Sequence, residues 1–116
     1  ADGCLIRSAR ISESVIGLRT RIGRDTVLRR TIVMGSDFYE LAEDRQSNWD
    51  RGLPNLGIGD ECLIENAIID KNARIGNRVQ IRNAQGVQRA DGDFYAIREG
   101  IVVIPKHAIV PDGTIL

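Results

Sequence analysis

The sequence has few of the residues that carry most enzyme chemistry. Among its 116 residues are one histidine and two cysteines, and aromatic residues make up only 4%. A lone histidine and two widely separated cysteines do not match the spacing of a metal site. The formal net charge is zero with both signs interspersed, which argues against a nucleic-acid-binding surface. No apolar run approaches the roughly 18 residues of a membrane span, and no signal peptide is apparent.

Large aliphatic residues recur with a six-residue period in two stretches. They are Ile16, Ile22, Leu28 and Met34 in the first, and Ile58, Ile64, Ile69, Ile75 and Ile81 in the second, where the period slips by one residue after Ile64. A period of six fits neither a helix at 3.6 nor a strand at 2. It is typical of the hexapeptide repeat, in which each hexad forms one short strand and one corner of a parallel β-helix. The sequence therefore predicts an all-β fold of this kind.

Each hexad also predicts which side chains face inward. The recurring aliphatic residue should point into the coil, with a small or branched residue four positions later packed beneath it. These second residues are Thr20, Thr26, Cys62, Ala73 and Val79. The positions between them are mostly charged or amide residues, which should face water. Single units of this kind bury too little surface to be stable, so they must stack.

The length and the cysteines agree with one small domain. A chain of 116 residues can form a single core, but its stability is marginal unless the ends of the stack are capped. The chain starts without a methionine and enters the repeat at once, so we expect it to be a piece of a longer protein. Cys4 and Cys62 occupy equivalent positions of the repeat. We expect both to be buried, reduced and packed as small apolar side chains, which favours a cytosol-like compartment.

The first stretch that leaves the repeat is residues 37–56. It carries few apolar residues among many charges. We predict a short helix near residues 40–50, closed by Gly52 and Pro54. Trp49 is expected to pin this insertion to the face of the coils.

The second departure covers residues 83–100 and is predicted to be a polar loop with Gly86 and Gly92 that leads to an alternating segment at residues 94–98. A β-branched run at residues 101–104 then resumes the β-helix. The last coil should end at the turn of residues 111–113, which contains proline, aspartate and glycine.

Lysine is rare in this chain, and its placement is the main functional signal. Fourteen of the 16 basic residues are arginine, and the two lysines are Lys71 and Lys106. Both follow an inward isoleucine by two positions, so both should point outward from a corner. If their coils are neighbours, the ammonium groups emerge about 5 Å apart. Two cations so close favour an anion between them, and Arg74 or Arg7 would complete such a pocket. The alternative is a pair of solvated surface lysines.

Two strings are more specific than generic hexads: IIDKNARIG (residues 68–76) and MGSDFYE (residues 34–40). With their surroundings they resemble the C-terminal domain of ADP-glucose pyrophosphorylase (glucose-1-phosphate adenylyltransferase) from bacteria, cyanobacteria and plants. The resemblance covers nearly the whole chain. It implies a left-handed parallel β-helix over residues 1–116, a regulatory and oligomerisation domain that follows an N-terminal catalytic domain.

The resemblance also implies site residues. Lys71, with Asp70 beside it, and Lys106 match activator-site lysines that bind a phosphate or sugar-phosphate effector such as 3-phosphoglycerate, with inorganic phosphate as inhibitor. Arg74 is a weaker candidate. The chain departs from the family pattern at Pro105 and His107. Because proline restricts the residue before it, the direction of Lys106 is open.

The resemblance assigns catalysis to another part of the parent enzyme. That enzyme is a nucleotidyltransferase that makes ADP-glucose and pyrophosphate from ATP, bound with Mg²⁺, and glucose 1-phosphate, for glycogen or starch synthesis. Its nucleotide loop and metal-binding carboxylates lie in the catalytic domain, so this fragment alone should be inactive and hold no cofactor. The expected partners are that catalytic domain and the other subunits of a tetramer. The expected compartment is the cytoplasm, or the plastid stroma in a plant or alga.

Two alternatives belong to other functional classes. Hexapeptide-repeat acyltransferases share the β-helix and use a histidine as general base, for which His107 is the single candidate. A zinc site like that of γ-carbonic anhydrases needs three histidines and is excluded by count. The other alternative is a purely structural module that joins subunits. It differs from the regulatory hypothesis in whether Lys71 and Lys106 converge.

Overall fold

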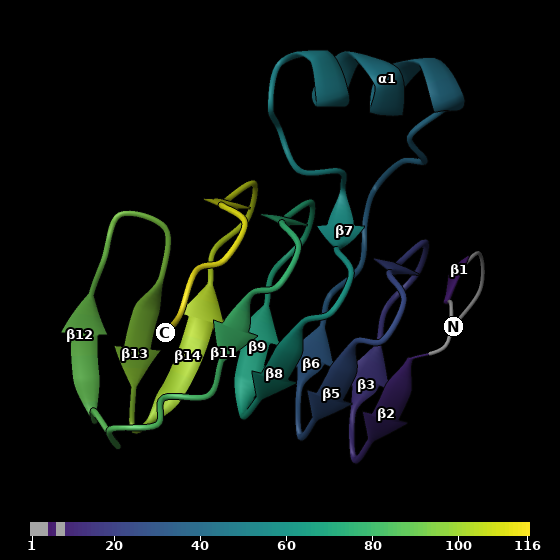
Figure 1. The fold of residues 1–116 in the computed structure, drawn as a ribbon. Helices are drawn as coiled ribbons and strands as arrows, with labels where there is room; N and C mark the ends of the chain where they lie inside the picture. Colours follow the sequence, from purple (N-terminus) through teal and green to yellow (C-terminus); the bar gives the residue numbers. More distant parts are fainter. Residues whose placement is uncertain (1–4, 7–8) are drawn as a thin grey trace.

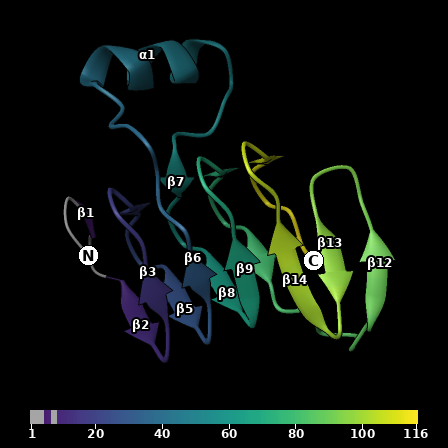
Figure 2. The same ribbon diagram turned by 180° about the vertical axis from the view of Figure 1, so that it is seen from behind.

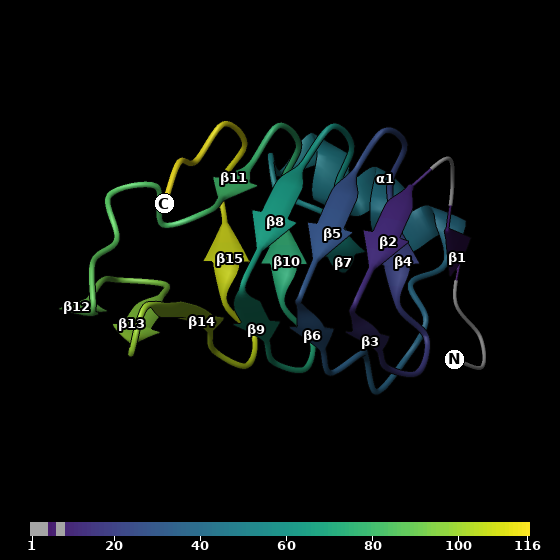
Figure 3. The same cartoon turned by 90° about the horizontal axis from the view of Figure 1, so that it is seen from below.

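The structure is a computed structural model that describes residues 5–6 and 9–116. The chain winds into a stack of coils whose strands form three sheets (Figures 1, 2 and 3). Sheet A contains β1 (Leu5–Ile6), β4 (Arg21–Ile22), β7 (Gly57–Ile58), β10 (Arg74–Ile75) and β15 (Ile109–Val110). Sheet B contains β2 (Arg10–Ser12), β5 (Val27–Arg29), β8 (Leu63–Glu65) and β11 (Gln80–Ile81). Sheet C contains β3 (Val15–Ile16), β6 (Ile32–Val33), β9 (Ala67–Ile69), β14 (Ile101–Ile104), β13 (Ala96–Arg98) and β12 (Arg89–Asp91).

One coil spans 17 residues, and equivalent residues of neighbouring coils pair in parallel. Ile58 of β7 pairs with Ile75 of β10, 17 positions later in the chain. The hexad must therefore shorten by one residue once per coil, as it does after Ile64. The same shortening occurs after Leu28, so the prediction that Met34 points inward was wrong. Val33 is 4% exposed and Met34 is 45% exposed.

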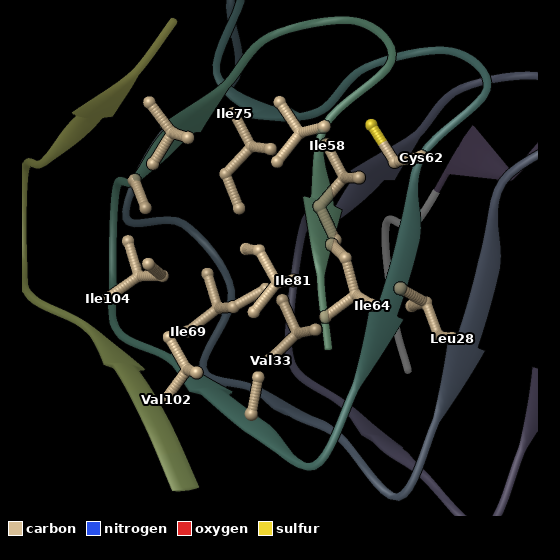
Figure 4. Close-up of a cluster of buried hydrophobic side chains, with 14 of the residues drawn as sticks. Leu28, Val33, Ile58, Cys62, Ile64, Ile69, Ile75, Ile81, Val102 and Ile104 are labelled. Carbon is tan, nitrogen blue, oxygen red and sulfur yellow. The ribbon is translucent and has the colours of Figure 1, made fainter. Parts of the chain in front are cut away.

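The core is a column of aliphatic side chains inside the coils (Figure 4). Leu28, Ile64 and Ile81 stack at equivalent positions of sheet B, and each is fully buried. The predicted second residues are also buried, which confirms the inward pattern. They are Thr20, Thr26, Cys62, Ala73 and Val79. The Thr26 hydroxyl donates to the Gly59 carbonyl oxygen at 2.8 Å, so the buried hydroxyl is satisfied.

The corners between sheets place many residues in the left-handed backbone region. The non-glycine residues of this kind are Glu13, Arg19, Asp25, Arg30, Glu61, Asn66, Asn72, Arg78, Asn83, Glu99 and His107. This conformation costs an L-residue about 1–2 kcal/mol, and asparagine tolerates it best. Burial of the stacked core outweighs this cost. The corner side chains consequently leave the coils at repeated positions and in similar directions.

Glycines allow close approach of the coils at one corner. A Cβ atom at Gly59 would lie 2.6 Å from the Gly76 carbonyl oxygen, and one at Gly23 would lie 2.6 Å from that of Gly59. Pro111 takes the next equivalent position, after β15, the outermost strand of sheet A. The missing N–H of this proline breaks no coil-to-coil hydrogen bond, because it has no neighbouring strand to which it would donate.

The first insertion forms helix α1 (Ala42–Asp50), as predicted, and Gly52 follows with φ +68°. Figure 1 shows α1 standing away from the stack near β7. The prediction for Trp49 was wrong, because its side chain is 81% exposed. The buried residue of α1 is Asn48, which is 2% exposed and donates to Glu40 and Asn55. No helix in the described part of the chain is long and apolar enough to cross a membrane.

The second insertion is more ordered than the polar loop that we predicted. Strands β12 and β13 form an antiparallel hairpin that extends sheet C beyond β14, at the end of the stack opposite β1 (Figures 1 and 2). The turn between them is closed by the Gly92 N–H, which donates to the Tyr95 carbonyl oxygen at 2.8 Å. The alternating segment at residues 94–98 contains β13, whereas β12 is three residues of mixed polarity and carries too little periodicity to be recognised in isolation. The resumption of the β-helix at β14 and its final turn at residues 111–113 are confirmed.

Replacing Gly59 by alanine should lower the free energy of unfolding by about 2–3 kcal/mol, because the added Cβ forces two coils apart. Gly86→Ala is the matched control. A Cβ there meets no atom within 4 Å, so its cost of about 1 kcal/mol comes from the positive φ alone. Urea denaturation followed by circular dichroism measures both. Equal losses would show that close approach at Gly59 is not a requirement of the fold.

Candidate functional site

The two lysines occupy the same corner of neighbouring coils. Lys71 follows β9 and Lys106 follows β14, and these strands pair directly with Ile69 opposite Ile104. The His107 N–H donates to the Lys71 carbonyl oxygen at 3.1 Å. The condition on which the predicted lysine pair depends, adjacency of the two coils, is therefore met.

Pro105 does not redirect the second corner. Ile104 remains in β14, which suits the extended conformation that a residue before proline prefers. The residues after each lysine have nearly the same backbone conformation, with φ 61° at Asn72 and 64° at His107. The backbone that carries Lys106 thus repeats the backbone that carries Lys71.

An anion of the chain itself lies at this corner. The Lys71 ammonium approaches Asp37 Oδ1 at 3.2 Å, and both side chains are 45% exposed. The Asn72 amide donates to Asp37 Oδ2 at 3.0 Å. In return, the Asp37 N–H donates to Asn72 Oδ1 at 2.9 Å. The position of Asp37 is thus set by its backbone bond to Asn72 as well as by the lysine.

The electrostatics of Asp37 connect it with both lysines. The hydrogen bond from Asn72 contributes most to lowering the pKa of the Asp37 carboxyl below its ordinary value, and that from Lys71 comes next. The charge of Lys106 lowers the pKa further. Both cations therefore favour the ionised form of one carboxylate. This corner, Asp37 with Lys71, Asn72 and Lys106, is called the lysine corner below.

The other two predicted residues have structural partners. Asp70 Oδ1 accepts a hydrogen bond from the Lys71 N–H at 2.7 Å, which shapes the turn that carries the lysine. Arg74 forms an ion pair with Glu40 at 2.8 Å, and its side chain is 22% exposed. Arg74 also donates to the Pro54 carbonyl oxygen at 3.1 Å. Since Arg74 holds the first insertion, the lysine corner is built without it, and its part in effector binding stays a prediction.

Glu40 is the centre of the contacts that hold the first insertion. Its side chain is 5% exposed and accepts hydrogen bonds from the Asn48 amide at 2.7 Å, from the Leu56 N–H and from Arg74. Burial of this carboxylate acts to raise its pKa. The three hydrogen bonds and the charge of Arg74 outweigh that effect and hold the pKa below its ordinary value of 4.5.

The remaining candidates do not form a catalytic or metal site in the described part of the chain. Cys62 is free and 1% exposed, as expected, and burial raises the pKa of its thiol. Cys4 and Arg7 lie outside the described residues. His107 is exposed on its corner. No group of three metal-ligating side chains occurs within residues 5–6 and 9–116.

A hollow of about 480 Å³ lies between α1 and sheet A and does not include the lysine corner. It is lined by residues of the insertion, such as Arg45, and by the glycine-rich corner near Gly59. Two aspartates in its wall already accept backbone hydrogen bonds. Asp60 accepts from the Arg24 N–H and Asp112 from the Asn77 N–H. The hollow therefore results mainly from the way in which the insertion leaves the stack.

The residues that sequence reasoning missed are Asp37, Asn72 and Glu40. Asp37 and Glu40 both belong to the specific string at residues 34–40. Asp37 could have been found by extending the register of the coils. Gly35 lies beside the coil of Lys71, because its carbonyl oxygen accepts a hydrogen bond from the Asn72 N–H at 3.1 Å. Asp37 then follows two positions later, beside the lysine.

Glu40→Gln should lower the free energy of unfolding by about 2–3 kcal/mol at pH 7, because the partly buried Arg74 loses its charged partner. A lowered folded-state pKa means that ionised Glu40 stabilises the fold above about pH 4.5. This contribution is lost as the pH falls through the folded-state pKa. The difference in free energy of unfolding between the two proteins should therefore narrow between pH 5 and pH 3.

Denaturation at several pH values measures this difference, with Glu43→Gln in the exposed first turn of α1 as control. A difference that does not change with pH would contradict the ionic role of Glu40.

Comparison with protein-family models matches residues 1–115 to the GLGC left-handed parallel β-helix domain. The match covers almost the entire chain. It agrees with the parallel pairing of the coils, and it confirms that the β-helix is left-handed, as predicted. The chain therefore belongs to the family of the C-terminal β-helix domain of ADP-glucose pyrophosphorylase, the nucleotidyltransferase also called glucose-1-phosphate adenylyltransferase.

Proposed function

We propose that this chain is the regulatory domain of an ADP-glucose pyrophosphorylase and that its lysine corner binds an anionic effector. The observation that carries the proposal is the placement of Lys71 and Lys106, the two lysines of the chain, on one corner of adjacent coils. Both cations already act on one carboxylate there. A phosphate or sugar-phosphate, such as 3-phosphoglycerate, offers the same kind of oxygen ligands with more negative charge.

Effector binding regulates an enzyme only if it favours one arrangement of the protein over another. The β-helix is a rigid stack, so we infer that the arrangement that changes is the packing of this domain against an N-terminal catalytic domain. The lysine corner would lie at that junction, and the isolated domain would bind the effector weakly. ATP, Mg²⁺ and the chemical step belong to the catalytic domain in this proposal, and the compartment is the cytoplasm or the plastid stroma.

Lys71→Ala and Lys106→Ala in the full-length enzyme should each raise the activator concentration needed for half-maximal response by about tenfold or more. Each removes a charge-assisted contact that contributes about 1.5–3 kcal/mol to binding. The rate at saturating activator should change little, because neither residue belongs to the catalytic machinery. The measurement is initial rate against the concentrations of 3-phosphoglycerate and inorganic phosphate.

Arg82→Ala is the control for removing a cation, because Arg82 is exposed and follows β11 of sheet B, at another corner. Its effector response should match the parent enzyme. If both lysine variants also responded as the parent does, the regulatory role would be wrong, and the structural-module alternative would stand.

A second role, in assembly, is favoured by the outer face of sheet C. One row of outward side chains crosses five strands of this sheet in register and is apolar throughout. The row is Val15, Ile32, Ile68, Val103 and Ala96. Val15 is 63% exposed and Ile32 is 43% exposed. The corresponding row of sheet B is not apolar throughout. It begins with the charged side chain of Arg10 and ends with the amide side chain of Gln80.

We propose that the apolar row of sheet C packs against the same row of a second subunit. Two identical apolar rows on flat faces are complementary to each other, which suits a two-fold interface. The chain also has no net charge, so two copies do not repel each other at long range. Such a contact would be one of the interfaces of the tetramer that the family resemblance implies.

Ile32→Glu should dissociate this interface and shift the full-length protein to a smaller species in sedimentation velocity. A charge placed in an apolar contact has no partner and remains hydrated only when the subunits separate. Val27→Glu on the outer face of sheet B introduces the same side chain on a neighbouring face of the same coil, and the assembly should persist. An unchanged mass with reduced stability for Ile32→Glu would instead show that the catalytic domain covers this row.

A further inference from the structure

Asp37 occupies the place where the proposed effector would bind. Its carboxylate lies 3.2 Å from the Lys71 ammonium, and the charge of Lys106 acts on it as well. A phosphate oxygen that bound Lys71 between the two lysines would meet this carboxylate at close range. One ammonium can donate to two anions, but two anions held there repel each other, which favours departure of the carboxylate.

We propose that Asp37 is a resident anion that competes with the effector for Lys71. This inference rests on the proposed function, since it concerns the same lysine corner. In the free protein Asp37 neutralises part of the charge of the two lysines. When the effector binds, the Asp37 carboxylate turns out to solvent and the effector takes its place on the ammonium.

The contacts of Asp37 permit this exchange. Turning out breaks two contacts of the carboxylate, with the Lys71 ammonium at 3.2 Å and with the Asn72 amide at 3.0 Å. Its side chain is 45% exposed, so water replaces both contacts and the released carboxylate is not trapped. Its N–H stays bonded to Asn72 Oδ1 at 2.9 Å, so the backbone keeps its place while the side chain turns. Glu40, three residues later, is the contrast, because a carboxylate that is 5% exposed cannot be released without moving the insertion.

The exchange also selects the chemical class of the ligand. A carboxylate on the ligand carries one negative charge, as Asp37 does, and gains nothing by replacing a tethered group that is already in place. A phosphate monoester carries about −1.5 to −2 charges at neutral pH, and so it gains more from the two lysines than Asp37 does. We therefore expect the lysine corner to bind dianionic phosphate compounds in preference to simple carboxylates.

The test is the binding of inorganic phosphate and of acetate to the full-length protein, measured by isothermal titration calorimetry at fixed ionic strength. Asp37→Asn removes the charge and keeps the shape. It should lower the Kd for phosphate by up to about fivefold, the upper end of the range for an exposed charge pair. It should also lower the Kd for acetate. Asp37→Ser should have the same effect, which guards against a misfolded Asn variant.

Asp91→Asn is the matched control. Asp91 also forms an exposed ion pair, with Arg98 at 2.7 Å, but it lies on the β12–β13 hairpin. The Kd for phosphate should be unchanged in this variant. Equal tightening in the Asp91 and Asp37 variants would show a general effect of net charge and would overturn the proposal. Weaker phosphate binding in both Asp37 variants would also overturn it, because Asp37 would then support the ligand.

A double variant separates this inference from the proposed function. If Asp37 acts by competing for Lys71, Asp37→Asn should have no effect in the Lys71→Ala background. If Lys71→Ala binds phosphate as tightly as the parent, the proposed site itself is wrong. If Lys71→Ala loses binding but Asp37→Asn leaves it unchanged, the site stands and the resident-anion inference fails.

Discussion

The register of the coils is the constraint on which the rest of this structure depends. Where no insertion intervenes, as between β7 and β10 or β8 and β11, the chain returns to the same position after 17 residues, and parallel pairing holds equivalent residues in one column. Corner residues with positive φ let the chain turn from one sheet to the next, and each non-glycine residue in this conformation costs about 1–2 kcal/mol. The register determines which side chains lie next to each other on the surface as well as in the core. Lys71 and Lys106 are far apart in the chain, yet they become neighbours because Ile69 pairs with Ile104.

The two insertions follow from the same constraint. An insertion is compatible with the stack if the strand that follows it pairs in register with the preceding coil, as β7 and β14 do. The first insertion leaves directly after the coil that pairs with Lys71. Its first residues therefore lie beside the lysine corner, where Asp37 bonds Lys71. Glu40 then fixes the insertion to Arg74 of β10. Only four residues, 37–40, separate the lysine corner from the contacts of Glu40, so the proposed displacement of Asp37 would act close to the contacts that hold the helix.

Much of the fold was predictable because the hexad reports burial directly. The inward residues, the small residues beneath them and the shared position of the two lysines all follow from counting. The wrong predictions concern residues whose position does not follow from a strict six-residue period. Met34 was misplaced because the shortening of one hexad per coil was recognised only in the second stretch. Trp49 was assigned a packing role from its hydrophobicity, but charge pairing at Glu40 holds the insertion and leaves the indole exposed.

The lysine corner was only half predictable, for a related reason. The lysines belong to the repeat, whereas Asp37 belongs to an insertion in which no period applies. Sequence reasoning concluded that two adjacent cations need an anion and looked for it outside the protein. The structure contains one inside the chain, at 3.2 Å from Lys71. This internal carboxylate offsets part of the positive charge of the corner without a ligand. The pairing of β9 with β14 holds the corner, so its backbone needs no rearrangement when the anion changes. In the proposed exchange, an effector would gain only the difference between its own contacts and those of Asp37. That difference would be modest, so the degree of binding would follow the effector concentration over a wide range.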